Sequence, residues 1–94
     1  MLPIQQFSPG VLAEIIRRQP PSKERTTFAW QMAVGTAVAR TTAVEIDERG
    51  VLTIRARDAH WAREVKRAFP TILARMQHLL GADAVTGMKV DAPR

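Results

Sequence analysis

Hydrophobic and polar residues between positions 50 and 81 follow a pattern that predicts a strand and then two helices. Residues 51–57 alternate with a period of two, which is typical of a strand with one buried face. The apolar face of this strand is formed by Leu52, Ile54 and Ala56. Asp58 ends the alternation, and its carboxylate can accept hydrogen bonds from the free N–H groups of a first helical turn. We therefore expect a helix to begin at Ala59.

Two short amphipathic helices are expected after this strand. The apolar side of the first is formed by Trp61, Ala62, Val65 and Ala68. A basic stripe on the opposite side is formed by Arg63, Lys66 and Arg67. Pro70 ends this helix and suits the first position of the next, where its missing N–H costs nothing. The second helix is closed by Gly81 and is expected to bury Ile72, Leu73, Met76, Leu79 and Leu80.

The residues before position 41 predict a short helix and a longer one. The short helix begins at the cap Ser8, ends before the two prolines at 20–21, and has an apolar stripe formed by Val11, Leu12, Ile15 and Ile16. Ser22 then caps a longer helix that carries Trp30 on its apolar side. Gly35 is expected to lie within that helix and to let it approach the sheet closely, since glycine inside a helix costs about 1 kcal/mol relative to alanine.

Two further strands complete the expected fold. Residues 41–46 are rich in β-branched side chains and should pair antiparallel with 51–57 across a polar turn, in which Gly50 takes a positive φ. Residues 85–90 supply a third strand, which a right-handed crossover would place parallel to the second. The order α-α-β-β-α-α-β predicts an α+β fold: a three-stranded sheet covered by helices, with the topology of a type II KH domain apart from an extra short helix.

Several of these segments, taken in order, resemble the DciA family, a family of KH-like domains. The matching segments are WQMAVGTAVARTT at 30–42, GVLTI at 50–54, DAHWAREV at 58–65 and VTGMKV at 85–90. The resemblance covers about residues 27–90 and implies a role in bacterial chromosome replication. Members of that family bind the replicative helicase DnaB and help to load it onto single-stranded DNA, so DnaB and single-stranded DNA are the expected partners.

Length and composition favour one small basic domain over residues 1–94, with 1–21 as a short helix and linker. Hydrophobic residues make up 46% and aromatic residues 5%, which is typical of an aliphatic core. The net charge is +5, and 11 of the 14 basic residues are arginine, whose planar fork suits phosphate. An ordinary solvated surface on an arginine-rich protein is the simpler explanation for any one of these residues.

Side-chain cations are the candidate nucleic-acid contacts. A KH domain grips the backbone of nucleic acid through a Gly-x-x-Gly loop between two helices, but the corresponding link, residues 66–71, has no glycine. The predicted binding residues are Arg55 and Arg57 on the outer strand face, with Arg63, Lys66 and Arg67 on the following helix. Trp30 and Trp61 lie on apolar helix sides and are expected to pack in the core or against another subunit instead of stacking on bases.

No residue pattern indicates catalysis, a cofactor or a small-molecule substrate. The chain has no cysteine, and its two histidines, His60 and His78, lie on separate expected helices without partners at metal-ligand spacing. The first ten residues lack the features of a signal peptide, and no apolar stretch is long enough to span a bilayer, so a cytoplasmic protein without membrane contacts is expected. We therefore expect neither an enzyme nor a metal site.

Two other functions fit the same features. One is a KH-like RNA-binding module that acts in translation or ribosome assembly. The other is an adaptor that contacts only proteins. Association with replication proteins would favour the helicase partner, sedimentation with ribosomes would favour the RNA-binding module, and indifference to all nucleic acid would favour the adaptor.

Overall fold

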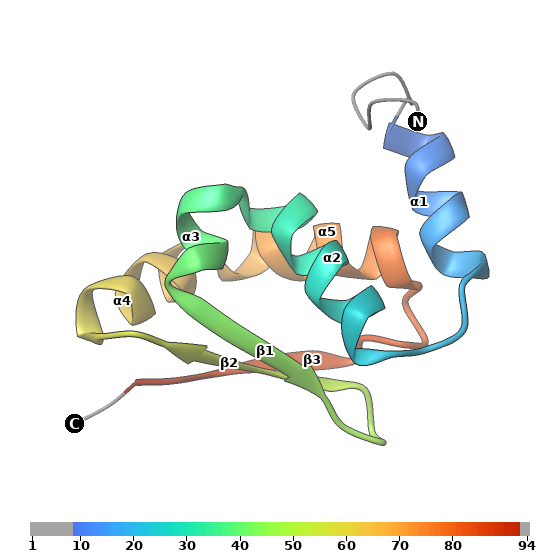
Figure 1. The fold of residues 1–94 in the computed structure, drawn as a ribbon. Helices are drawn as coiled ribbons and strands as arrows, with labels where there is room; N and C mark the ends of the chain where they lie inside the picture. Colours follow the sequence, from blue (N-terminus) through green and yellow to red (C-terminus); the bar gives the residue numbers. More distant parts are fainter. Residues whose placement is uncertain (1–8, 93–94) are drawn as a thin grey trace.

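The computed structural model describes residues 9–92, in which helices cover one face of a three-stranded sheet (Figure 1). The elements in chain order are α1 (Pro9–Arg18), α2 (Lys23–Val34), α3 (Thr36–Arg40), β1 (Thr42–Ile46), β2 (Val51–Ala56), α4 (Ala59–Arg67), α5 (Phe69–Leu80) and β3 (Gly87–Asp91). The expected cap Ser8 lies outside the described residues. Ser22 and Asp58 cap α2 and α4 as predicted, accepting hydrogen bonds from the N–H groups of Arg25 and Trp61.

The sheet has the predicted connectivity, with β2 between β1 and β3. β1 pairs antiparallel with β2, placing Val44 opposite Ile54, and β3 pairs parallel with β2, placing Val90 beside the same residue. The expected α+β class is confirmed: a small domain with a mixed three-stranded sheet packed against helices, in a layout consistent with a KH-like fold. The third strand starts two residues later than predicted, because Thr86 instead hydrogen-bonds to the backbone of the hairpin turn.

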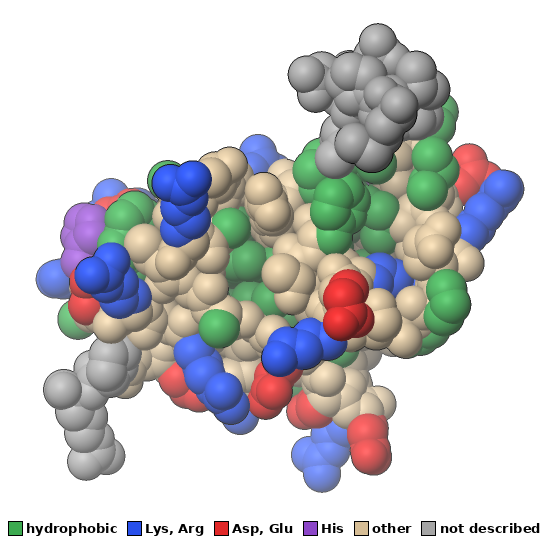
Figure 2. Space-filling view, in the orientation of Figure 1, with side chains coloured by type: hydrophobic (Ala, Val, Ile, Leu, Met, Phe, Trp, Pro, Cys, Tyr) green, Lys and Arg blue, Asp and Glu red, His purple; other side chains and the backbone are tan. Residues whose placement is uncertain are grey.

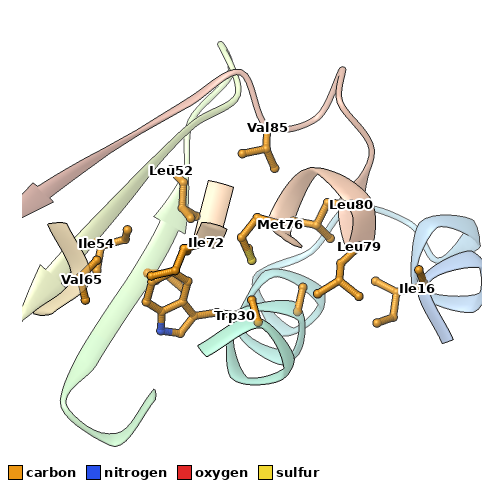
Figure 3. Packing of buried hydrophobic residues seen from close by; sticks show 14 of the residues in the cluster. Ile16, Trp30, Leu52, Ile54, Val65, Ile72, Met76, Leu79, Leu80 and Val85 are labelled. Atoms are coloured by element: carbon orange, nitrogen blue, oxygen red, sulfur yellow. The ribbon is translucent and has the colours of Figure 1, made fainter. Parts of the chain in front are cut away.

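The core lies between the sheet and the helices above it (Figure 3). The predicted inner face of β2 is buried, and both Leu52 and Ile54 are inaccessible to solvent. Among the largest fully buried side chains, the helices contribute Trp30, Met76 and Val65. α1 joins this core through Leu12, Ala13 and Ile16. The prediction for its apolar stripe was half right, because Val11 and Ile15 are 47% and 40% exposed.

The two tryptophans have different environments. Trp30 is buried as expected, and its indole N–H donates to the Thr42 hydroxyl at 2.8 Å. Trp61 is only partly buried and lies outside the main cluster, with its ring edge-on to His60. Of the two expected roles of Trp61, a place in the core is not observed, because Ala62 and Val65 form the buried side of α4 and position 61 lies at its border. Packing of Trp61 against another subunit stays a prediction.

Gly35 ends a helix instead of lying within one. Its backbone has φ +86° and ψ 168°, and its N–H donates to the carbonyl of Gln31. A right-handed helix cannot continue through this conformation, so the predicted long helix is divided into α2 and α3. A Cβ atom at Gly35 would meet nothing within 4 Å, so the glycine does not serve close approach to the sheet. Its role is to turn the chain.

The hairpin between β1 and β2 is closed by Asp47 and Gly50. The Asp47 carboxylate accepts from the N–H groups of Arg49 and Val51 at 2.8 and 3.0 Å. The hydrogen bond from Val51 is the main cause of the lowered pKa of Asp47. Gly50 has the predicted positive φ, +83°, and its carbonyl accepts from the Thr86 N–H. A Cβ atom at Gly50 would lie 2.9 Å from the carbonyl oxygen of Ala84.

Gly50→Ala should lower the free energy of unfolding by roughly 1 to 3 kcal/mol, because it combines a strained φ with a backbone clash. Gly10→Ala is the matched control, since a Cβ there meets open space in α1 and alanine favours a helix. The control should be neutral or slightly stabilising. Urea unfolding of both variants checks this, and equal midpoints would contradict the tight approach of the hairpin turn to the residues before β3.

Candidate nucleic-acid interface

Three of the five predicted cations lie on the exposed side of α4. The Asp58 carboxylate starts this helix by accepting from the Trp61 N–H at 3.0 Å. Ala62 and Val65 then face the core, which leaves Arg63, Lys66 and Arg67 in solvent. Arg67 approaches Glu64 at 3.8 Å but its side chain is 78% exposed, so the pairing is weak. Arg63 and Lys66 form no ion pair within residues 9–92.

The other two predicted cations belong to the outer face of the sheet and to its edge. Arg55 projects from the central strand, and its guanidinium contacts Glu45 of β1 at 3.3 Å. Asp91 of β3 is its register partner on the other side, so a second carboxylate-bearing residue neighbours it. Arg57 is exposed in the connection from β2 to α4. The α4 group is therefore freer of nearby carboxylates than Arg55 is.

These cations do not form one continuous patch. Figure 2 shows several Lys and Arg side chains at the end of the molecule formed by α3 and α4, and others interspersed with carboxylates along the sheet. Arg57 lies in the chain between β2, which carries Arg55, and α4, which carries the other three cations. A polyanion that bound both the α4 cations and the sheet cations would contact them at separate places on the surface.

The link between α4 and α5 offers no phosphate-binding loop. Ala68 is the single residue between the two helices, and its N–H already donates to the Glu64 carbonyl at 3.3 Å. Pro70, near the start of α5, has no N–H to offer. The backbone grip of a Gly-x-x-Gly loop is therefore not formed at this link, and contacts to phosphate would have to come from side chains.

Sequence reasoning missed a groove between α2, α3 and β1. Its volume is about 430 Å³, and Lys23 and Arg40 both line it. The two residues belong to different helices and come to one groove only because the chain turns at Gly35. No periodic pattern connects them, so no local signal in the sequence could have predicted the site.

Metal-ligating side chains do not cluster in the part of the chain that the structure describes. No group of three or more histidine, aspartate or glutamate residues there could hold a metal ion. His60 is exposed beside Trp61, and His78 is exposed with its carbonyl accepting from Arg17. None of the helices between residues 9 and 92 is long and apolar enough to cross a membrane.

The family of the chain follows from a match to a family model. The model described as "Dna[CI] antecedent, DciA" matches residues 3–90. The chain belongs to the DciA family. The match extends the expected resemblance of 27–90 through α1, so the helix that carries Leu12 and Ile16 is part of the DciA domain. No curated protein matches the sequence.

Proposed function

We propose that this DciA-family protein is a non-catalytic replication factor that binds the replicative helicase DnaB and single-stranded DNA, and assists in loading the helicase. The family match over residues 3–90 is the observation that carries the proposal, because it points to a helicase-loader type of role. A loader of this kind needs contacts to protein and DNA and needs no chemistry of its own.

The exposed cations support the DNA part of the proposal. Arg63, Lys66 and Arg67 project from a helix whose opposite side is fixed in the core, so their guanidinium and ammonium groups can meet phosphate without unfolding the domain. Arg57 adds a further exposed cation in the connection from β2 to α4. Of the two stacking candidates for a base, Trp30 is 2% exposed and is held by Thr42, and Trp61 is partly buried beside His60. Contacts to phosphates would therefore dominate, and affinity would depend strongly on salt.

The helicase part of the proposal is tested with purified components. Mixed with the replicative helicase of the same organism, the protein should co-elute with it in size-exclusion chromatography, without added nucleotide or DNA. Ribosomal subunits are the comparison partner, and sedimentation with them should be absent. Failure to bind helicase together with co-sedimentation with ribosomes would favour the RNA-binding module. Binding to the helicase without any binding to single-stranded DNA would favour the protein-only adaptor.

Replacing Arg63, Lys66 and Arg67 with glutamine should weaken single-stranded DNA binding and flatten its salt dependence. If all three contact phosphate, the slope of log affinity against log salt falls by about 2, at about 0.7 per phosphate. Fluorescence anisotropy with labelled dT20 across a salt series measures this slope.

The pair Arg55→Gln and Arg57→Gln is the comparison variant. Its effect should be smaller, because Arg55 is already engaged by Glu45. Both sets are exposed, so the thermal midpoint should stay near that of the wild type. An unchanged slope in both variants would exclude these residues as the phosphate contacts.

A further inference from the structure

The groove between α2, α3 and β1 has the composition of a site for a polyanion. Lys23 at the start of α2 and Arg40 at the end of α3 both line it, and no carboxylate does. Both cations are exposed, and neither forms an ion pair or a side-chain hydrogen bond within residues 9–92. Several other arginines are held by a partner within the domain. Arg18 pairs with Glu14, Arg55 pairs with Glu45, and Arg75 donates a hydrogen bond to the carbonyl of Ala33.

Neutral hydrogen-bond donors lie between these cations in the lining. Thr27, Gln31 and Thr36 are exposed there, and their side chains have no hydrogen-bond partner among the described residues. Hydroxyl and amide donors beside a guanidinium are groups that bind the oxygens of phosphate. The lining therefore offers charge and free donors together.

The groove does not offer a platform for bases. Its aromatic residue, Trp30, is 2% exposed, and its N–H donates to Thr42. The Thr42 hydroxyl in turn donates to the Val38 carbonyl at 2.8 Å, so both side chains are committed to the fold. A ligand in this groove would be recognised through its anionic groups and would leave its bases outside.

The groove continues onto the outer face of the sheet. A smaller hollow of about 90 Å³ shares Lys23, Ala43 and Val44 with it and is also lined by Arg55 and by Glu45, which pairs with Arg55 at 3.3 Å. Lys23 therefore lines both hollows along β1, with Arg40 in the larger one and the paired Arg55 in the smaller one. An extended track of this kind fits a chain of phosphates better than a single free ion.

We propose that this groove binds the sugar–phosphate backbone of single-stranded DNA, with Lys23 and Arg40 neutralising phosphates and Thr27, Gln31 and Thr36 donating hydrogen bonds. The proposal rests on the proposed function and adds to it a second DNA contact, whose lining contains no residue of α4 or of the link between α4 and α5. Because the contacts are to phosphate, binding in the groove is independent of base sequence.

The test compares two variants that lose the same charge. Lys23→Gln with Arg40→Gln removes both groove cations, whereas Arg18→Gln with Arg49→Gln removes two exposed cations that line neither hollow. Fluorescence anisotropy with labelled dT20 is measured across a salt series. The groove variant should lose affinity several-fold and flatten the salt slope by about 1.4, from two phosphates at about 0.7 each. The control should keep a slope within about 0.3 of the wild type, and circular dichroism melts should show both variants folded.

The outcomes separate this proposal from the proposed function. Equal losses in the two variants, with dT20 still bound by the wild type, would overturn the groove as a site and leave DNA binding intact. No binding of dT20 by the wild type would overturn DNA binding itself and the groove with it. A loss confined to the groove variant, with the same size on dT20 and dA20, supports the proposal, and a loss seen with only one of these strands would contradict a phosphate-directed site.

Discussion

Burial of the central strand is the constraint on which the rest of the domain depends. Leu52 and Ile54 are inaccessible to solvent, and their strand carries neighbours on both sides, one antiparallel and one parallel. A parallel neighbour needs a connection that crosses over the sheet, and α4 and α5 provide it while they cover the apolar face. The same alternation that buries Leu52 and Ile54 turns Arg55 outward. One period-two segment thus determines both the core and the charged outer face of the sheet.

The sequence predicted best the features that are determined by neighbours along the chain. The caps Ser22 and Asp58, the alternation of β2 and the positive φ of Gly50 each depend on a few adjacent residues, and the structure contains all of them. Gly35 was misread because a glycine suits both a helix that packs closely and a chain that turns, and only the tertiary arrangement decides between them. Trp61 lies at the border of the buried side of α4 and not in the core, because a helical pattern locates the middle of an apolar side more precisely than its edges.

The candidate site was less predictable than the fold. Exposure of Arg63, Lys66 and Arg67 follows from the amphipathic pattern of α4, and the structure places them in solvent. Whether they bind DNA stays a prediction. The contact between Arg55 and Glu45 depends on how β1 and β2 pair. The presence of both Lys23 and Arg40 in one groove depends on the turn at Gly35. Both features depend on tertiary structure, and the hydrophobic periodicity of the sequence does not predict them.

The central claim is that exposed cations on a rigid DciA fold bind single-stranded DNA through phosphates, and an NMR titration tests it most directly. Adding unlabelled dT20 to ¹⁵N-labelled protein should shift amide signals of α4 around Lys66 and of the groove around Lys23 and Arg40. Amide signals of Leu52 and Ile54 in the central strand should stay in place. Shifts confined to α1, or shifts throughout the core strand, would contradict the account.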